Sequence, residues 1–475
     1  MERRSLLKGI SAAAAVGAGV KLVGGGKISA ESTHVLADTL AGPGPLAQAK
    51  DMSMRGLPPL KITDVKIIKT APDNSNWTIV KVYTSEPGLY GIGTSTHQEV
   101  PAAAQAYVED RLKPFVVGMN VNEIDNIWQS AYVQQYFRDG PESNNALSGI
   151  DGALWDILGK RTGVPVYQLL GGKCRAAVPL YGHCQAADQS HLNDQIQAYI
   201  DKKYQVVRVQ MATPGFSGYS GGQTSDATQA LRPDGAQEFG EGNEYPNISP
   251  VTDPVRYITT VINMFAAVRE KFGYDIGLVH DVHERPTPNQ AIELCRAVQG
   301  YRPFYMEDCL SPEDVSWFKI FREETTAPLA MGELFVNRME WLPLVANRWI
   351  DYIRCHQSAI GGLNMCRKIA HTCEMFDVRT AWHGPNNVDP VGHCYNLHLD
   401  LASPNFGIQE ETVFSDKVRE VFPGAPDIRN GYMYTNDKPG WGMDIDEAAA
   451  AKYPYKVAFE GRGNQRFLDG GISRP

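Results

Sequence analysis

The sequence contains no apolar run long enough to cross a membrane, no basic region beyond its first residues and no paired cysteine motif. The longest apolar stretch, residues 9–20, is too short to span a bilayer and is followed by Lys21. Acidic residues outnumber basic ones by 54 to 45, so a concentrated basic face for nucleic acid is not expected. With 43% hydrophobic and 21% charged residues, the chain is neither disordered nor membrane-spanning in composition.

The eight cysteines are scattered, without a C-x-x-C pair or the spacing of a zinc site. They therefore predict no metal centre. An oxidising compartment would permit disulfides, but a chain of 475 residues builds a core large enough to need none. We expect buried free thiols.

The N-terminus differs from the rest of the chain. Arg3-Arg4-Ser5-Leu6-Leu7-Lys8 precedes the short apolar stretch and resembles a twin-arginine export signal. We expect residues 1–30 to be a signal peptide, with residues 28–30 as a possible cleavage site and a periplasmic or otherwise exported product. A frayed N-terminal arm on a cytoplasmic protein is the alternative.

Two folded regions are expected after a linker at residues 31–58, which are rich in Ala, Gly and Pro. The first, residues 59–175, predicts an α+β domain. Its strands are expected at 62–68, 77–84 and 90–94, and its helices at 101–112, 121–135 and 144–162.

The second region, residues 176–415, alternates short apolar strands with helices, a pattern typical of parallel βα units in a barrel. Eight strands are predicted, at 178–183, 205–210, 276–282, 303–307, 328–332, 350–355, 378–382 and 406–409. Helices are predicted at 190–203, 254–272, 288–298, 311–323 and 363–376. Residues 211–250 predict a long functional loop at the barrel mouth, and residues 416–475 are expected to pack on the first domain.

Three acidic residues, Asp281, Glu307 and Glu333, end three successive predicted strands and are each 26 residues apart. Equal spacing of one βα unit places their side chains at corresponding heights on the carboxyl-terminal rim of a barrel. Three carboxylates that share a small volume need a compensating cation, and oxygen ligands favour Mg²⁺. Any one of them could be a helix cap, but the repeated position favours a metal site.

The motifs around these acids resemble those of the enolase superfamily, most closely the mannonate dehydratase group. They are Leu278-Val-His-Asp281-Val-His283-Glu284, Tyr305-Met-Glu307-Asp308, Met331-Gly-Glu333, His383-Gly-Pro and Asn405-Phe-Gly-Ile-Gln-Glu410. The resemblance covers roughly residues 60–470. It implies a modified TIM-type (β/α)7β barrel, an N-terminal α+β capping domain completed by the C-terminal segment, one Mg²⁺ per subunit and a homo-oligomer.

The same resemblance assigns the proton-transfer groups. Many relatives carry lysines on the second barrel strand, whereas this chain has Arg208 there. The resemblance makes Tyr219, in the loop that follows, the base, and an adjacent guanidinium is needed to favour a phenolate whose free pKa is about 10. His283 is assigned as the acid, and strand alternation after Asp281 is expected to direct both side chains into the mouth. An exposed Tyr219 and a structural His283 are the alternatives.

Further positions match substrate-contacting residues of the family: Asn76, His183, His383, Asp389 and Glu410. Two features depart from the group. The chain ends Gly471-Ile-Ser-Arg-Pro475, without the tryptophan that commonly closes the pocket, and Pro385 lies at a position that varies with substrate preference.

The resemblance implies a carbon–oxygen lyase that removes water from an aldonic acid such as D-mannonate to give the 2-keto-3-deoxy acid. A dehydratase for gluconate or a uronate-derived acid is one alternative. A noncatalytic sugar-acid sensor that retains the metal site is another.

Overall fold

A computed structural model of the chain describes residues 57–97, 99–213, 251–456, 466–467 and 474. The chain divides into two units, Met1–Pro59 and Leu60–Pro475, and every element below belongs to the second unit. The predicted signal peptide and most of the linker lie outside the described residues and remain predictions. None of the described helices combines the length and the hydrophobicity that crossing a membrane requires.

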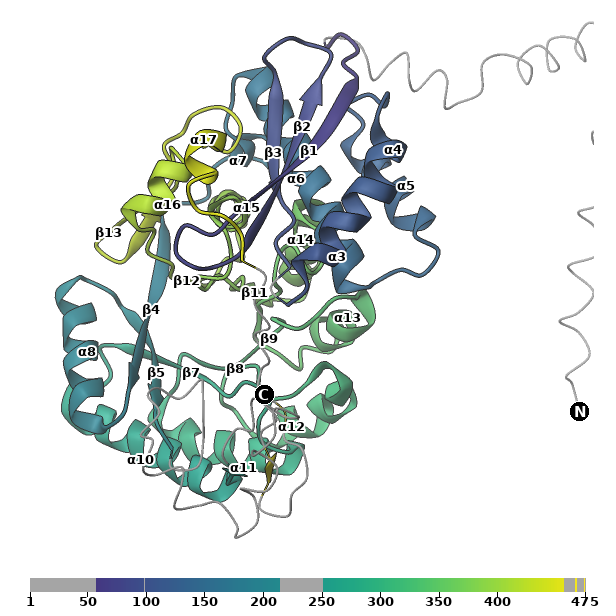
Figure 1. Cartoon of the computed structure of the whole chain (residues 1–475). Helices are drawn as coiled ribbons and strands as arrows, with labels where there is room; N and C mark the ends of the chain where they lie inside the picture. Colours follow the sequence, from purple (N-terminus) through teal and green to yellow (C-terminus); the bar gives the residue numbers. More distant parts are fainter. Residues whose placement is uncertain (1–56, 98, 214–250, 457–465, 468–473, 475) are drawn as a thin grey trace, which may run out of the picture. The chain divides into compact units, whose positions relative to one another are not determined.

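The first folded region is built on a three-stranded antiparallel sheet of β1 (Ile62–Thr70), β2 (Trp77–Thr84) and β3 (Tyr90–Thr94). Figure 1 shows these strands in purple, with the helices of the same region beside them. The helices are α3 (Pro101–Tyr107), the π-helix η1 (Val108–Leu112), α4 (Lys113–Val116), α5 (Ile124–Gln134) and α6 (Pro141–Thr162). The predicted strands and helices of this region are confirmed.

Helix α6 packs closely on β3 because glycines remove the side chains between them. A Cβ at Gly93 would lie 2.1 Å from the carbonyl oxygen of Gly149, and one at Gly91 would lie 2.0 Å from that of Ala153. Pro141 at the first turn and Gly163 (φ 73°) after the last turn define the ends of the helix. The contact fixes the sheet against the longest helix of the region.

The second region is a barrel of eight strands, as predicted. They are β4 (Val178–Ala186), β5 (Val206–Met211), β7 (Gly277–Asp281), β8 (Tyr305–Glu307), β9 (Leu329–Met331), β10 (Tyr352–Ile353), β11 (Arg379–Thr380) and β12 (Gln409–Glu410). Strands β4 to β11 pair in parallel in that order. A bridge from Thr380 to Phe406 and the pairing of β12 with β4 close the ring.

Helices cover the outside of the strands (Figure 1). They are α8 (Gln189–Asp201), α10 (Pro254–Phe272), α11 (Pro288–Val298), α12 (Phe318–Glu324), α13 (Arg338–Ala346), α14 (Leu363–Met375) and α15 (Pro390–Ala402), with the short helices η2 (Gln299–Tyr301) and η3 (Pro312–Trp317). The short helix α7 (Val166–Leu169) contacts α6 and α15. Helix α15 is buried on nearly every side. For example, the Tyr395 ring stacks on Trp441, and its hydroxyl accepts a hydrogen bond from the Thr94 N–H. Such a helix lacks the amphipathic stripe that identifies outer helices in a sequence.

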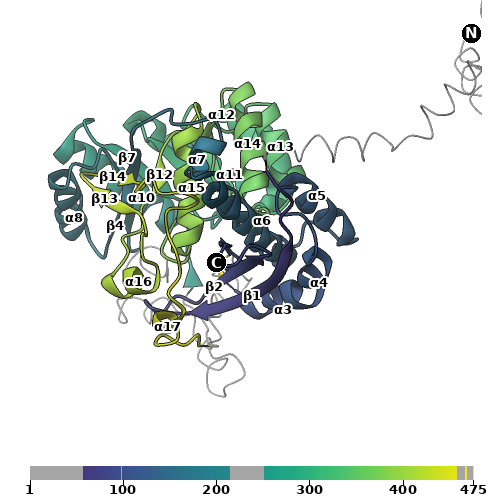
Figure 2. The same cartoon turned by 90° about the horizontal axis from the view of Figure 1, so that it is seen from above.

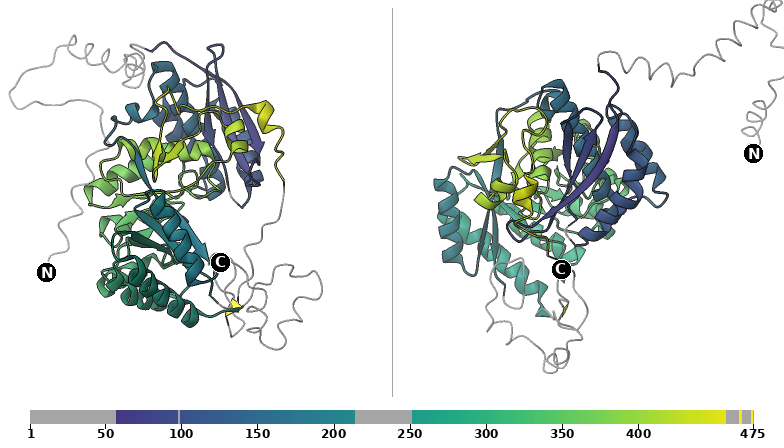
Figure 3. Two further views of the ribbon diagram at one scale, coloured as in Figure 1. Left: turned by 90° about the vertical axis from the view of Figure 1, so that its left-hand side faces the viewer. Right: turned by 45° about the horizontal axis from the view of Figure 1, so that its top comes forward.

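The chain after the barrel returns to the first sheet through α16 (Asp416–Val421), β13 (Asp427–Arg429), β14 (Tyr432–Tyr434) and α17 (Glu447–Ala450). Glu447 pairs with Lys66 and Lys81, and Tyr90 donates to Asp444. Figures 2 and 3 show the yellow helices α16 and α17 near the purple strands.

The last described residues lie on the barrel side instead. Strand β15 (Arg466–Phe467) pairs with β6 (Val251–Thr252), and Arg474 forms an ion pair of 2.6 Å with Asp314. Because segments before and after the barrel share contacts, the two regions form one compact unit.

We predict that His398 makes folding stability pH-dependent. Its buried ring accepts the Tyr167 N–H through Nδ1, and burial lowers its pKa from 6.5 to about 3. The unfolded chain therefore binds a proton that the folded chain does not, so stability falls as pH falls below about 6.5. Substitution of His398→Asn, which keeps an acceptor, is expected to recover about 2 kcal/mol of the stability lost between pH 7.5 and pH 5.

Urea unfolding of wild type and variant at both pH values measures this difference. The control is His371→Asn on the exposed face of α14. Parallel pH profiles for wild type and His398→Asn would contradict the prediction.

Candidate active site

The site lies directly above an apolar layer inside the barrel. This layer contains Tyr181, Val206, Val279, Tyr305, Ala330, Ala381 and Ile408, one residue from each of seven strands or strand ends. Alternate residues of a strand face the same side, so the residue two positions later continues into the barrel mouth. On six of these strands that residue is His183, Arg208, Asp281, Glu307, His383 or Glu410. The predicted site residues thus follow from a single layer of the barrel core.

Glu333 reaches the same level by a different route, because it comes three residues after Ala330. Gly332 lies between them with φ 141°, and a Cβ there would approach the Cys355 nitrogen to 2.9 Å. Glycine is favoured at positive φ and at such close approach. The positive φ of Gly332 interrupts the strand alternation, so that Glu333, and not residue 332, provides the side chain at this level of the mouth.

Two buried arginines lie among the carboxylates. Arg208 Nη1 is 3.5 Å from Asp281 Oδ2, 3.3 Å from Glu307 Oε1 and 3.4 Å from Glu410 Oε1. Arg354 Nη1 pairs with Asp308 and lies 3.4 Å from Glu333 Oε2, while its Nη2 lies 3.0 Å from Glu410 Oε2. Asp281, Glu307 and Glu333 are thus gathered into one cluster.

The cluster holds more negative than positive charge. Its five carboxylates and two guanidiniums, if all ionised, leave a formal surplus of three negative charges. Burial raises the pKa of Glu307 to about 8, against the opposing influence of Arg354 and Arg208. Burial also raises the pKa of Asp308. Two arginines alone do not stabilise the full set of carboxylates in the ionised form.

A divalent cation fits this donor set. Hard oxygen donors suit Mg²⁺, and the Asp281 Oδ1 atom is buried without a hydrogen-bond partner. Within the described ranges, no three His, Cys, Asp or Glu side chains already stand at ligand positions around one point. The acids contact guanidiniums instead: Arg208 contacts Asp281 and Glu307, and Arg354 contacts Glu307 and Glu333. The ligand roles of Asp281, Glu307 and Glu333 remain predictions that the composition of the cluster supports.

His283 belongs to the cluster, but strand alternation does not place it there. Strand β7 ends at Asp281, and His283 and Glu284 have φ of 52° and 50° in a turn. The Glu284 N–H donates to the Asp308 carbonyl at 2.7 Å and anchors this turn to the next strand end. Although burial would raise the Glu333 pKa, His383 and, to a smaller extent, the nearby His283 and Arg354 hold it well below its usual range. His283 therefore lies near the acids as predicted, but the predicted cause, strand alternation, was wrong, because the left-handed turn orients its side chain.

Two predicted histidines contact the acids. His183 Nε2 lies 3.1 Å from Glu410 Oε1, and burial and Arg208 lower the His183 pKa while Glu410 opposes them. His383 Nε2 lies 3.3 Å from Glu333 Oε1. Burial would raise the Glu410 pKa, but His183, Arg354 and His383 lower it overall. The acids at both sides of the cluster therefore stay ionised.

Two predicted substrate contacts are engaged elsewhere. Asp389 is the buried N-cap of α15, where its carboxylate accepts from Val391 N–H, Gly392 N–H and the hydroxyls of Thr94 and Thr96. Its assignment to substrate is corrected, because helix capping uses its oxygens. The Asn76 side chain donates to the Lys456 carbonyl at 2.7 Å and accepts from its N–H at 3.1 Å. Tyr219 lies outside the described residues.

An open cavity of about 570 Å³ adjoins the cluster. Its lining combines site residues with mostly polar neighbours and two apolar ones, Pro385 and Val413; the others are His183, Gln185, Tyr199, Arg208, Asn386, Glu411 and Thr412. Pockets of about 300–1,000 Å³ hold small ligands, and a ligand with many hydroxyl groups needs polar side chains around it as hydrogen-bond partners. This cavity is therefore the candidate substrate pocket.

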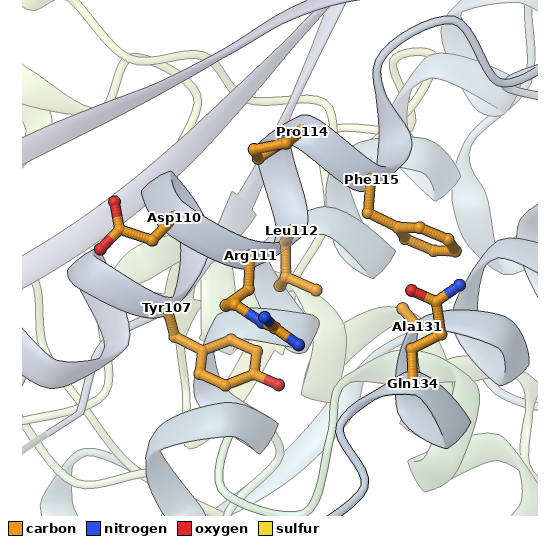
Figure 4. A pocket seen from close by; sticks show the side chains of 8 residues that line it. All are labelled: Tyr107, Asp110, Arg111, Leu112, Pro114, Phe115, Ala131 and Gln134. Atoms are coloured by element: carbon orange, nitrogen blue, oxygen red, sulfur yellow. The ribbon is translucent and has the colours of Figure 1, made fainter.

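A separate hollow of about 340 Å³ lies in the first region, between η1, α4 and α5 (Figure 4). It is lined by Tyr107, Asp110, Arg111, Leu112, Pro114, Phe115, Ala131 and Gln134. None of these residues belongs to the carboxylate cluster, and the hollow has no group of acids. It is not the active site.

Sequence reasoning missed three residues of the site: Arg354, Asp308 and His356. Arg354 occupies the strand predicted at 350–355, where an arginine in an otherwise apolar barrel strand was the available signal. Asp308 directly follows Glu307 and turns inward because its φ is 43°. His356 Nδ1 lies 2.8 Å from His383 Nδ1. Only the fold brings these three to the acids.

A closed parallel barrel with acids and arginines on its carboxyl rim, joined to an α+β region, is the arrangement of a barrel enzyme whose chemistry takes place at the carboxyl ends of the strands. Residues 56–171 match the mandelate racemase/muconate lactonizing enzyme N-terminal domain, and residues 233–449 match the enolase C-terminal domain-like family. A D-galactonate dehydratase family member from Salmonella enteritidis is 48% identical over 421 residues, 88% of this chain and 99% of the relative. RspA from Pantoea ananatis, of the same family, is 46% identical over 423 residues, with 88% and 99% covered.

A crystal structure of an enolase from Pantoea ananatis with bound D-gluconate and magnesium has a TM-score of 0.80 and 44% identity, and the match covers 88% of this chain and 100% of that one. The chain belongs to the D-galactonate dehydratase family of the enolase superfamily. It is therefore a dehydratase, a carbon–oxygen lyase of the hydro-lyase type.

We predict that Arg354→Met strongly destabilises the metal-free protein. The substitution keeps the apolar stem but leaves Asp308 and Glu333 without a guanidinium partner, and Glu307 and Glu410 with Arg208 alone. Breaking a buried ion pair from one side costs about 3–5 kcal/mol. The control is Arg296→Met, which removes an exposed pair with Glu324 and should cost less than about 1 kcal/mol.

The measurement is urea unfolding in the presence of a chelator. Equal losses of stability for the two variants would show that the buried cluster does not depend on Arg354.

Proposed function

We propose that the protein is a Mg²⁺-dependent dehydratase that removes water from a six-carbon aldonic acid and releases the 2-keto-3-deoxy acid. The observation that carries this proposal is the cluster of five buried carboxylates, arginines and histidines beside a polar cavity of about 570 Å³. D-Gluconate is the first substrate to test, since the 44% identical relative was crystallised with D-gluconate and magnesium. D-Mannonate, which differs from it at C2, is the second.

Asp281, Glu307 and Glu333 would hold the metal ion in this proposal. When bound, Mg²⁺ supplies positive charge to the substrate carboxylate and so stabilises the negative charge that develops when the neighbouring C–H is deprotonated. Arg208 and Arg354, both buried, would keep the surrounding acids ionised and orient an anionic substrate. The site therefore suits proton abstraction next to a carboxylate.

Two groups would move the protons. Tyr219, from the segment after β5, would remove the C2 proton, and the guanidinium of Arg208 would favour its phenolate. His283, which lies beside the acids and carries the positive φ described above, would protonate the departing C3 hydroxyl. Transfer of the C2 proton to Tyr219 and departure of the C3 hydroxyl as water, with a proton from His283, would give the enol of the product. The enol would then take up a proton at C3 and lose the proton of its C2 hydroxyl, which gives the 2-keto-3-deoxy acid.

The experiment that tests this function incubates the purified protein and Mg²⁺ with D-gluconate, D-mannonate, D-galactonate and uronate-derived acids, followed by assay of the 2-keto-3-deoxy product. We expect turnover of at least one aldonic acid. Tyr219→Phe should abolish product formation while it leaves Mg²⁺ binding unchanged. Binding of an acid without any product would overturn the dehydratase and favour a sugar-acid sensor.

The metal site generates a separate prediction. Saturating Mg²⁺ binds only the folded chain and should stabilise it by about 2.7 kcal/mol at a concentration 100 times the dissociation constant. Glu333→Gln removes one proposed ligand and should lose most of that gain, whereas Glu324→Gln in the exposed ion pair should keep it. Thermal unfolding with and without Mg²⁺ measures the effect, and an equal Mg²⁺ response in both variants would remove Glu333 from the ligand set.

A further inference from the structure

Two aromatic side chains are exposed to solvent just after helix α5. Tyr136 is 81% exposed and Phe137 is 87% exposed, and their rings form an edge contact with centroids 5.2 Å apart. Single exposed apolar residues are ordinary on a protein surface, but each aromatic side chain carries about 150–250 Å². Covering this aromatic pair would therefore remove a large apolar area from water.

The backbone directs the aromatic pair outward. Tyr136 has φ 60°, a left-handed conformation that is uncommon for a bulky residue. Asp139 follows with φ 70°, and its carboxylate accepts a hydrogen bond from the Tyr132 hydroxyl at 2.8 Å. The Phe137 N–H donates to the Gln135 carbonyl at 2.7 Å. The segment is thus held by its own hydrogen bonds with both rings in solvent.

A hollow of about 250 Å³ lies beside the aromatic pair. Tyr132 and Asp139, which flank the pair in the sequence, belong to its lining, and further lining comes from α6, α13 and α14, which lie near α5 (Figures 1 and 2). Its apolar side chains include Trp128, Trp341 and Met365. A cavity of about 150 Å³ holds a benzene ring, so this hollow is large enough for one aromatic side chain.

The exposed apolar surface continues on α13. Met339 and Leu342 are exposed and lie three positions apart, so they share a face of this helix. Val133, near the end of α5, is exposed as well. Together with the aromatic pair these side chains expose on the order of 600 Å², the upper end for a monomer and near the roughly 800 Å² that each partner buries in a stable interface. The surface is therefore large enough for a stable protein partner.

A second copy of the chain fits this surface. The projecting pair and the hollow lie side by side, so a two-fold rotation places the pair of each copy at the hollow of the other. Charges also match, because Asp139 lies next to the pair, whereas Arg338 and Lys368 line the hollow from α13 and α14. Arg138, on the projecting segment, lies over the Tyr132 ring of its own chain. Opposite charges therefore come together when two copies meet.

We propose that Tyr136 and Phe137 form the centre of a two-fold interface between two copies of this chain, in which the aromatic pair of each copy fills the hollow of the other. The interface joins the first region and the barrel of both copies, because the hollow is lined by α5 and α6 together with α13 and α14. It does not depend on the proposed function, since a protein without turnover would form the same contact.

Sedimentation velocity of the purified full chain at several concentrations tests the interface. We expect wild type to sediment with at least twice the mass of one chain. The double substitution Tyr136→Asp and Phe137→Asp places charges in the apolar centre, so it should lower the mass and raise the dissociation constant at least about 100-fold. The control is Val255→Asp, at an exposed apolar residue of α10 that does not line the hollow, and it should keep the wild-type mass.

Photocrosslinking identifies what covers the aromatic pair and needs no variant that disrupts the contact. The full chain with Phe137→p-benzoylphenylalanine is illuminated, and the products are separated by denaturing electrophoresis and mapped by mass spectrometry. We expect a product of two chains, crosslinked from position 137 to peptides with hollow residues 128–132 or 336–341.

Three results would overturn the proposal. They are a wild type with the mass of one chain at every concentration, an unchanged mass in the double variant, and crosslinks from position 137 only within one chain. Crosslinks to residues 1–56 of the same chain would show that its own N-terminal segment covers the pair instead.

Discussion

The structure of the barrel mouth depends on the electrostatic balance between buried carboxylates and two buried guanidiniums. Arg208 and Arg354 each reach at least three acids, and Glu307 and Glu410 lie against both. Isolated charges are costly to remove from water, so such a cluster is stable only when its opposite charges are close and well placed. The surplus of acid remains, and it favours the binding of a further cation.

The same balance relates stability to function. A site that attracts a divalent metal and an anionic substrate needs carboxylates and arginines close together, and neither set would be stable alone in the core. The apolar layer of Tyr181, Val206, Val279 and their neighbours lies directly beneath. It excludes water from below and so strengthens the interactions between charges above it.

The first region and the C-terminal segment contribute by fixing the framework around the mouth. Asp389 holds the N-terminus of α15 to Thr94 and Thr96 of the first region, and Asn76 binds the backbone of Lys456. In a sequence alone, a polar side chain that connects two segments cannot be told from one that contacts substrate, because the residue types are the same. The hydrogen bonds of Asn76 and Asp389 connect segments far apart in the chain, and for the fully buried Asp389 they use the carboxylate oxygens.

The sequence by itself determined the order of strands and helices, the barrel class and the residues that the strands carry into the mouth, because strand alternation and βα spacing are local properties. It identified Asp281, Glu307 and Glu333 on that basis, and Arg208 and Glu410 through the resemblance to the family. Only the tertiary structure decided the positions that depend on backbone turns or on distant partners: Asp308 and His283 at positive φ, Gly332 against Cys355, Arg354 among four acids and His356 against His383. The physical reason is that a left-handed turn reverses the direction expected from alternation, and a buried charge or imidazole takes its role from neighbours that arrive from other strands.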